Sequence, residues 1–309
     1  MGHKKNRKET SRAPLTPEQV KSELMDGVTI ETLIALGVLT HKGGASPSAK
    51  RKVKQVNHLL SQMNQALSDI FKRYDNPVIV DMGAGRATVS LALYDRWIRT
   101  HNKGQLIAIE SRPELVEKVR SATATAYPRF KMIEGTALTS DLPERVHLVL
   151  GLHACDLATD HAIARGITLK ADYVSLVPCC QAEFAQALKR SDRSDALAHL
   201  WSSPHHRREF GTHLTNVARV LALKSVGYTV NVTELTGWEH SMKNELIIAR
   251  RVGRYHQQAQ DELKTLLIEM GLIGTNGADL AHTPWLINSL PKLIEQRDLH
   301  SSQSESKSP

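Results

Sequence analysis

The sequence contains few cysteines, few aromatic residues and no long apolar segment. Of its 309 residues only Cys155, Cys179 and Cys180 are cysteines, and aromatic residues make up 5%. Three cysteines cannot build a disulfide framework, which favours a reducing compartment. No apolar run reaches the ~20 residues that a membrane-spanning helix needs, and the basic opening MGHKKNRKETSR leads into no apolar signal-peptide core. We therefore expect a cytoplasmic protein that does not associate with a membrane.

The residues that are abundant indicate a globular protein with a basic surface. Hydrophobic residues make up 41% of the chain and charged residues 23%, which is enough to bury a sizeable core in one large domain or two modest ones. The formal net charge is +8. Such an excess favours an anionic partner such as RNA.

The chain divides into five segments by composition. Residues 1–14 are polar and basic and residues 300–309 are rich in serine, so we expect both to be disordered tails. Residues 15–74 form a helical N-terminal segment, with two short helices between Thr16 and Leu39 and one long amphipathic helix from Ala49 to Phe71. Residues 75–252 form the main domain, and residues 253–299 form a C-terminal helical appendage, with helices expected over 257–270 and 284–297.

Short β-branched runs alternate with helical stretches through the main domain. This order is typical of a doubly wound α/β fold with a mostly parallel, Rossmann-like sheet. After a helix over 214–225, two further strand patterns follow with only a short connection, so the last strand should run antiparallel to the others. The expected strands are 78–80, 105–110, 130–135, 147–152 and 173–178, followed by the two runs YTVNVTEL and NELIIAR.

The stretch VIVDMGAGRATVS, residues 78–90, joins a buried strand to a glycine loop and a helix. A dinucleotide-binding loop has the pattern G-x-G-x-x-G/A, but here Thr88 takes the third position after Gly83 and Gly85. Asp81 precedes the glycines and can meet a cationic ligand group, which suits the ammonium and sulfonium of S-adenosylmethionine better than a pyrophosphate. Glu110, at the end of the second strand, is placed to accept ribose hydroxyls. The alternative is that the glycines form only a tight strand-to-helix turn.

Four segments together resemble one known family. They are DMGAGRATVSLAL, LHACDLATD (152–160), VPCCQ (177–181) and KNELIIA (243–249), and KRKVKQVNHLL resembles the lead-in helix. The resemblance, over residues 48–252, is to the S-adenosylmethionine-dependent methyltransferase domain shared with methyltransferase-like 25 and the glutathione S-transferase C-terminal-domain-containing protein. It implies a class I methyltransferase sheet, S-adenosylmethionine as cofactor, and a cofactor site made by Asp81, Gly83, Gly85 and Glu110.

The resemblance also implies that two loops rim the methyl-transfer site. His153 or Asp156 can take the proton of the acceptor, since the pKa of histidine lies near neutrality, although His153 could instead only hydrogen-bond within its turn. Pro178 followed by Cys179 is compatible with a nucleophilic cysteine for carbon methylation, or with cysteines that only pack or shape the pocket. A zinc ion is a third alternative, but no C-x-x-C spacing supports it and we expect no metal. The expected pocket residues are Cys155, Pro178, Cys179 and Cys180.

Two basic clusters point to RNA as the acceptor. KRKVK opens an expected helix, where cations oppose the helix dipole, so local stability does not explain them. WSSPHHRREF, residues 201–210, is expected to be a loop whose aromatic and basic side chains stack on bases and pair with phosphates. Each cluster could also be an ordinary solvated surface. The expected RNA-binding residues are Lys50, Arg51, Lys52, Lys54, Arg207 and Arg208.

The acceptor atom is left open by the sequence. An Asn/Asp-Pro-Pro-Tyr/Phe motif is absent, which disfavours DNA adenine methylation. We expect an RNA methyltransferase acting on rRNA or tRNA. A protein methyltransferase, or a catalytically silent RNA-binding or assembly factor on a methyltransferase scaffold, are the alternatives.

Overall fold

The computed structural model describes most of the chain between residues 47 and 305. At the first residues of α3 (47–54) and the last residues of α11 (296–305), the structure describes the backbone but not the side chains. The described residues are 28, 29, 32, 34, 39, 47–152, 157–178, 182–191, 195–235, 245–278, 280 and 283–305.

Seven strands form one mixed sheet in this part of the chain. Their order is β3-β2-β1-β4-β5-β7-β6, with β7 antiparallel to both of its neighbours and all other pairs parallel. This is the arrangement of a class I methyltransferase, and the predicted α/β class and the predicted antiparallel final strand are both confirmed. The strands are β1 (Val78–Met82), β2 (Gln105–Glu110), β3 (Phe130–Glu134), β4 (Leu148–Gly151), β5 (Tyr173–Leu176), β6 (Tyr228–Glu234) and β7 (Glu245–Arg251).

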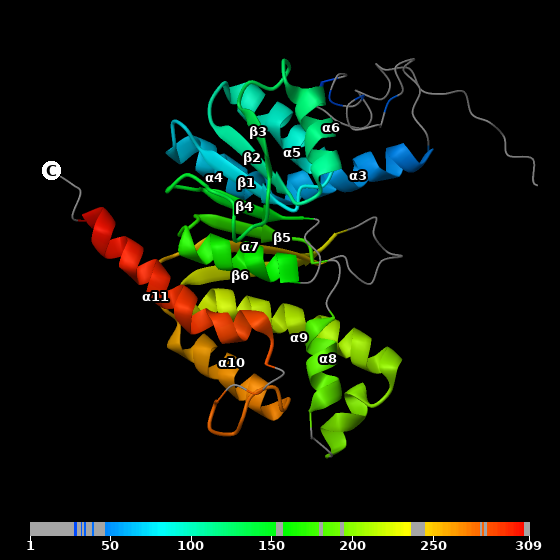
Figure 1. Cartoon of the computed structure of the whole chain (residues 1–309), viewed down its shortest axis with the longest axis vertical. Helices are drawn as coiled ribbons and strands as arrows, with labels where there is room; N and C mark the ends of the chain where they lie inside the picture. Colours follow the sequence, from blue (N-terminus) through cyan, green and yellow to red (C-terminus); the bar gives the residue numbers. More distant parts are fainter. Residues whose placement is uncertain are drawn as a thin grey trace, which may run out of the picture.

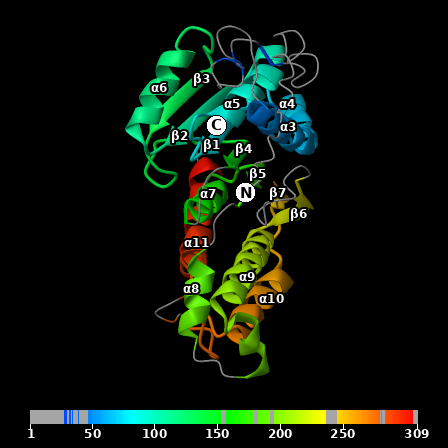
Figure 2. The same ribbon diagram turned by 90° about the vertical axis from the view of Figure 1, so that its right-hand side faces the viewer.

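Helices cover both faces of the sheet, as Figures 1 and 2 show. The N-terminal helices α3 to α6 lie on one face, and α7 and α9 lie on the other, with α10 and α11 packed against these two. The helices are α3 (Pro47–Gln62), α4 (Asn64–Arg73), α5 (Thr88–Leu93), the π-helix η1 (Tyr94–Arg99), α6 (Pro113–Thr123), α7 (Leu157–Thr168), α8 (Glu183–Arg190), the 3-10 helix η2 (Ala196–Trp201), α9 (Pro204–Ser225), α10 (Gln257–Glu269) and α11 (Trp285–Glu305).

The strands β1, β2, β4, β5 and β7 contribute alternate side chains to two separate cores. Ile79 of β1 packs with α3, α4 and α5, whereas its neighbours Val78 and Val80 pack with α7 and α9. Because both faces are buried, the central strands are continuous apolar runs rather than alternating ones. This is why five strands could be located from the sequence to within a few residues.

Three helix predictions need correction. The expected single helix over 49–71 is divided at Met63, although backbone hydrogen bonds run through the junction, from Met63 N to Leu59 O (3.2 Å) and from Leu67 N to Met63 O (3.0 Å). Residues 201–210, expected to form a loop, instead contain the end of η2 and the first residues of α9. Ser203 caps α9 by accepting a hydrogen bond from His206 N. Helix α11 continues to Glu305, past residue 300 where we placed the start of a disordered tail.

The C-terminal helices belong to the main core. Leu286, Leu290 and Leu293 of α11 are buried in the cluster that also contains residues of β1, β5 and β7. Trp285 stacks edge-on against His161 of α7, with ring centroids 4.5 Å apart. In the part of the chain that the structure describes, no helix is long and apolar enough to cross a membrane.

Before residue 47 the structure describes only five positions, so the two helices expected between Thr16 and Leu39 lie largely outside the described residues. Val28 and Leu39 are buried in the core beside α3 to α6. The backbone N–H and the hydroxyl of Thr29 donate to Asp95 Oδ2 in the π-helix, at 2.9 and 3.0 Å. Asp95 thus anchors this segment to the domain.

Candidate functional site

The loop after β1 can exist only with small residues at particular positions. Gly83 and Gly85 have φ angles of 74° and 58°, in the left-handed region that side chains disfavour. The backbone N–H groups of Gly83 and Ala84 both donate to Ile109 O, each at 2.9 Å, which ties the loop to the end of β2. The loop then turns into α5, which begins at Thr88. The sequence therefore forms a tight strand-to-helix turn at the carboxyl edge of the sheet, where α/β folds bind ligands.

Asp81 lies beneath this loop with one oxygen unsatisfied. Its side chain is buried, and Ser90 of α5 donates a hydrogen bond to Oδ2. Among the described residues Oδ1 has no hydrogen-bond partner. The pKa of Asp81 is raised to about 6, chiefly by burial. The hydrogen bond from Ser90 opposes this rise, and the negative charge of Glu110 adds to it. A buried carboxylate oxygen without a partner is costly, so this atom fits a cationic or hydrogen-bond-donating ligand group.

Glu110, by contrast, is fully occupied by donors from its own chain. Its Oε2 accepts from Gly85 N at 2.8 Å, and its Oε1 accepts from the backbone N–H groups of Ser111 and Arg112, both at 3.1 Å. The guanidinium of Arg112 donates to both oxygens, from Nε to Oε1 at 2.9 Å and from Nη2 to Oε2 at 3.2 Å. Burial alone would raise the pKa of Glu110, but the hydrogen bonds from Arg112 and Gly85 hold it below its usual value.

The sheet brings these two acids to one edge. Strands β1 and β2 are parallel neighbours, with Asp81 opposite Ala108 and Met82 opposite Ile109. Asp81 and Glu110 therefore flank the glycine loop. Asp81 has one oxygen without a donor, whereas both oxygens of Glu110 accept hydrogen bonds. These two carboxylates can accept hydrogen bonds from a ligand with a cationic group and a hydroxylated ring, provided that Arg112 moves away from Glu110.

Two residues of this site were not predicted from the sequence. Ser90 carried a readable signal, because a hydroxyl inside the apolar run ATVSLAL has to find a hydrogen-bond partner when it is buried. Arg112 also carried one, as a cation two residues beyond the acid that ends β2. Neither signal predicts that Ser90 contacts Asp81 or that Arg112 contacts Glu110.

Part of the expected acceptor pocket lies outside the described residues. The residues outside the described part are His153, Cys155, Asp156, Cys179 and Cys180. The zinc and cysteine-nucleophile alternatives are therefore not tested. The strands that lead to these residues are parallel neighbours, and Gly151 of β4 lies opposite Leu176 of β5. Of the expected pocket residues Pro178 is described, and it is buried just after β5.

A buried polar network holds the elements that follow these loops. Arg219 of α9 donates from Nε to Asp160 Oδ1 at 2.7 Å and from Nη2 to Asp160 Oδ2 at 2.9 Å. Both side chains are almost inaccessible, at 1% and 4% exposure. Asn216 of α9 donates to Glu245 Oε2 at 2.6 Å, at the start of β7. The network therefore fixes the first turn of α7 and the first residue of β7 to the same helix.

A second contact links the C-terminal helix to the same region. The backbone N–H of Trp285 donates to Glu183 Oε1 at 2.7 Å, in the first turn of α8. The Trp285 ring also contacts His161 of α7. One residue thus touches the helices that follow both expected acceptor loops.

The expected RNA-binding residues are on two separate helices. Lys50, Arg51, Lys52 and Lys54 belong to the first turns of α3, where only the backbone is described. Arg207 is half-buried and donates to Trp201 O at 3.3 Å, whereas Arg208 is exposed. The N-terminal ends of α3 and α9 lie on the same side of the molecule, at the right in Figure 1, but far apart along its long axis. The structure does not bring the two clusters together.

The expected stacking role of Trp201 is wrong. Its ring is buried, at 4% exposure, and stacks on Phe210 with centroids 5.6 Å apart. A buried indole holds η2 against α9 and presents no free face to a base. The basic side chains at the start of α9 remain compatible with phosphate binding.

Comparison with known proteins identifies the domain. Residues 51–187 match the family model described as a methyltransferase domain. The match covers the glycine loop, both acids and the strands β1 to β5. This domain and the seven-stranded sheet define the class of the protein as an S-adenosylmethionine-dependent methyltransferase. No curated protein matches the chain.

Several solved structures are similar to the chain at low sequence identity. The SAH-bound Podospora anserina methyltransferase PaMTH1 has 13% identity and a TM-score of 0.42, over 78% of this chain and 98% of that one. The 23S rRNA methyltransferase ErmE has 12% identity and a TM-score of 0.40, over 77% and 97%. The Methanococcus jannaschii fibrillarin pre-rRNA processing protein has 14% identity and a TM-score of 0.38, over 58% and 68%. With TM-scores below 0.5, these similarities support no conclusion about this protein.

Proposed function

We propose that the protein binds S-adenosylmethionine through Asp81, Gly83, Gly85 and Glu110 and transfers its methyl group to RNA. The observation that carries the cofactor assignment is the unpartnered, buried Oδ1 of Asp81 beneath the glycine loop. The ammonium of the cofactor would satisfy this oxygen and favour the ionised carboxylate. The ribose hydroxyls would take the place of the Arg112 guanidinium at Glu110.

The chemistry that the cofactor supplies is a methyl group already activated by a sulfonium. The protein therefore has to position the acceptor and receive its proton. Parallel strands β4 and β5 lead to the two segments that would do this, and the Arg219 and Trp285 contacts hold the helices behind them. We infer that the methyltransferase unit spans residues 75–252, since all seven strands lie within it, and that it is related to the domain shared with methyltransferase-like 25 and the glutathione S-transferase C-terminal-domain-containing protein.

Calorimetry with S-adenosylhomocysteine tests the cofactor site without an acceptor. Asp81→Asn removes the charge that faces the ammonium, and Gly85→Leu places a side chain in a left-handed loop against the ligand. We expect both variants to lose at least tenfold in affinity, on the scale of about 1.4 kcal/mol, while remaining folded. Asp261→Asn on the exposed face of α10 is the matched control. Undiminished affinity in the Gly85 variant would contradict the assignment.

RNA is the proposed acceptor because of where the positive charge lies. The chain has a net charge of +8, and the first turns of α3 carry Lys50, Arg51, Lys52 and Lys54. Each phosphate neutralised by a lysine or arginine releases counterions, so RNA affinity should fall steeply with salt. Filter binding of the wild type and of a variant with these four residues changed to Gln tests this. A flat salt response in the wild type would remove the support for RNA, and a comparison of methylated nucleosides with methylated peptides would then decide for protein.

We propose that His153 or Asp156 takes the proton of the acceptor, with no covalent bond between enzyme and substrate. Cys155, Cys179 and Cys180 would then shape the pocket beside Pro178. Once an acceptor is found, Cys179→Ser should keep measurable activity and His153→Ala should lose much more. A covalent adduct with a fluorinated pyrimidine RNA that disappears in Cys179→Ser or Cys180→Ser would establish the carbon-methylation route instead.

A further inference from the structure

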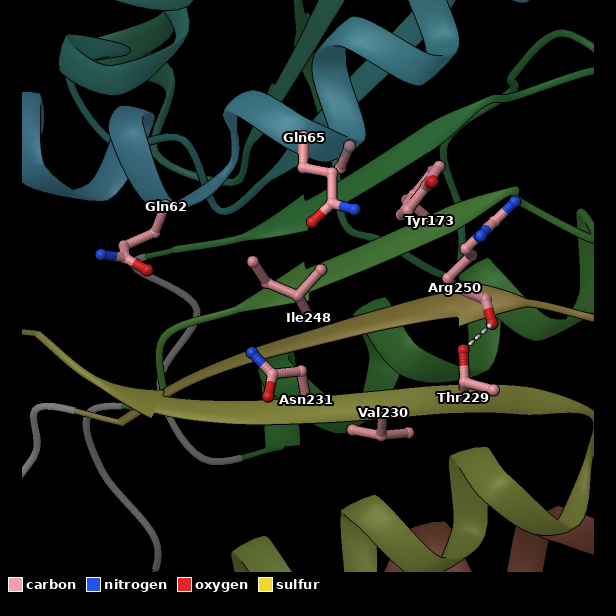
Figure 3. A pocket seen from close by; sticks show the side chains of 9 residues that line it. Gln62, Gln65, Tyr173, Thr229, Val230, Asn231, Ile248 and Arg250 are labelled. Carbon is pink, nitrogen blue, oxygen red and sulfur yellow. Dashed lines mark hydrogen bonds between the residues drawn. The ribbon is translucent and has the colours of Figure 1, made fainter.

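A pocket of about 250 Å³ lies away from the cofactor site, between the α3–α4 junction and the outer strands of the sheet. Figure 3 shows it between Gln62 and Gln65 on one side and strands β5, β7 and β6 on the other. Tyr173, at its inner end, is the first residue of β5, whereas the cofactor residues lie at the opposite, carboxyl edge. The pocket is therefore a separate feature of the surface.

Four polar side chains that line the pocket make no hydrogen bond or close ion pair with the described residues, although the charge of Arg250 helps to lower the pKa of Asp69. The side chains of Gln62, Gln65 and Asn231 make no hydrogen bond to any other described residue. Arg250 forms no ion pair within 4.0 Å among the described side chains. Asn231 stands in the middle of a β-strand, where asparagine is disfavoured, so local structure does not account for it. We call Gln62, Gln65, Asn231 and Arg250 the amide pocket.

The other polar groups nearby are already committed. Tyr173 donates to Asp69 Oδ2 at 2.9 Å, and burial raises the pKa of Tyr173 to about 12, so its hydroxyl stays protonated and bound to Asp69. Thr229 donates to the backbone oxygen of Arg250 at 3.3 Å, the bond drawn in Figure 3. The half-buried side chain of Ile248 provides an apolar surface between them. A ligand would therefore meet three carboxamides and one guanidinium around an apolar patch.

This chemistry matches one nucleotide. A carboxamide donates and accepts in one plane, as the edges of nucleobases do, and Asn and Gln read such edges in pairs of hydrogen bonds. A guanidinium binds phosphate through a planar pair of donors. The volume is just below the range of about 300–1,000 Å³ typical of small-molecule sites, which suits a single base and not a segment of folded chain.

The pocket lies at the C-terminal end of α3, and the basic residues lie at the N-terminal end of the same helix. Gln62 is the last residue of α3, and Lys50 lies twelve residues earlier, so they are about 18 Å apart at 1.5 Å per residue. At about 3.4 Å per stacked nucleotide this distance corresponds to about five nucleotides. An RNA strand whose phosphates follow the lysines and arginine of α3 can therefore place one base in the amide pocket.

We propose that the amide pocket binds one base of the RNA, giving base preference at a site remote from methyl transfer. This rests on the proposed RNA acceptor. Base-edge contacts and phosphate contacts differ in their salt response, because only the phosphate contacts release counterions. Replacing the amide side chains should therefore lower the affinity for RNA without changing its salt dependence.

The test uses Gln65→Ala combined with Asn231→Ala, and fluorescein-labelled ten-nucleotide RNAs of each single base and of mixed sequence. Anisotropy titrations at 50 to 200 mM salt should show about a tenfold loss of affinity for the preferred base, with an unchanged slope of log affinity against log salt. The differences between the four homopolymers should shrink. Arg250→Gln should instead lower the slope by about one. Gln257→Ala combined with Gln258→Ala, two exposed amides on α10, is the matched control.

Two outcomes would overturn the proposal, and they are distinguishable. If the wild type binds RNA with a steep salt slope and the Gln65 and Asn231 variant keeps the same base preference, the amide pocket does not read a base. If the wild type binds no RNA even at 50 mM salt, the RNA acceptor fails and the pocket proposal with it. Both altered residues are exposed, so the variant should keep the wild-type melting temperature. If it does not, Gln62→Ala at the end of α3 provides the same comparison.

Discussion

The guanidinium of Arg112 pairs with both carboxylate oxygens of Glu110, the residue that should receive the ribose of the cofactor. Glu110 also accepts backbone hydrogen bonds from Gly85, Ser111 and Arg112 itself. In the proposed complex, the cofactor therefore competes with a side chain of the protein for the same two oxygens. Arg112 is 59% exposed, so it has room to move into solvent.

We expect Arg112→Ala to bind S-adenosylhomocysteine about two- to fivefold more tightly than the wild type. The reason is that an exposed ion pair contributes up to about 1 kcal/mol, which the ligand no longer has to displace. Arg112→Lys should lie between the two, because a lysine cannot reproduce the paired donors. Calorimetry measures all three. Weaker binding in Arg112→Ala would instead show that the guanidinium contacts the cofactor.

Asp81 should make the stability of the ligand-free protein depend on pH. Its pKa is about 6 in the folded protein and 3.8 in the absence of perturbation, so the folded state holds the proton more tightly. The free energy of unfolding should therefore fall as the pH rises from about 4 to 6, by up to about 3 kcal/mol, and stay level above this range. Asp81→Asn should remove this fall and be more stable than the wild type at pH 7. Urea denaturation at pH 5 and pH 7 measures both.

The affinity for the cofactor should change with pH in the opposite direction, because it depends on the same Asp81 carboxylate. A cationic ligand group favours ionised Asp81, so affinity for S-adenosylhomocysteine should rise between pH 5 and 7 and then level off. Calorimetry in buffers of different ionisation enthalpy should detect proton release near pH 6. An affinity that does not change with pH would show that Asp81 does not face the ammonium.

The buried pair of Arg219 and Asp160 should be sensitive to the loss of one partner. Arg219→Met leaves a buried carboxylate without its cation, and we expect the free energy of unfolding to fall by about 3–5 kcal/mol. Combining it with Asp160→Leu should recover much of the loss, because no buried charge is left. Arg208→Met, on the exposed face of the same helix, is the control. Equal stability of the single and double variants in urea would argue against a buried ion pair.

Gly211 should tolerate no side chain. A Cβ at this position of α9 would lie 2.9 Å from the backbone N and Cα of Ala185 in α8. Although alanine favours a helix more than glycine does, the two backbones would have to separate, so we expect Gly211→Ala to cost about 1–3 kcal/mol. Thermal denaturation against Arg208→Ala measures this. An increase in melting temperature would show that α8 can move.

Local patterns predicted the parts of the fold that depend on neighbouring residues. The strands were visible as apolar runs, and Asp81, the glycines and Glu110 were visible because the end of a strand and its loop are adjacent in sequence. Ser203 followed by Pro204 was a readable helix start, but the basic residues after it led us to expect a loop. The division at Met63 had no signal, since neither glycine nor proline is present there.

Long-range pairs could not be predicted in the same way. Asp160 and Arg219 are 59 positions apart, and each residue alone reads as a helix surface charge. The amide pocket joins residues 62 and 65 to 231 and 250, and their grouping depends on the strand order rather than on spacing. Such contacts follow from the topology once it is known.

The position of Trp285 has a consequence for the order in which the chain folds. Its contact partner His161 on α7 precedes it by 124 positions (from 161 to 285), and Leu286, Leu290 and Leu293 complete the core on that face. On the ribosome, α7 therefore emerges long before the residues that cover it. Contacts of such large separation slow folding and prolong the exposure of apolar surface. We therefore expect the nascent chain to need shielding of this apolar surface until α11 has been synthesised.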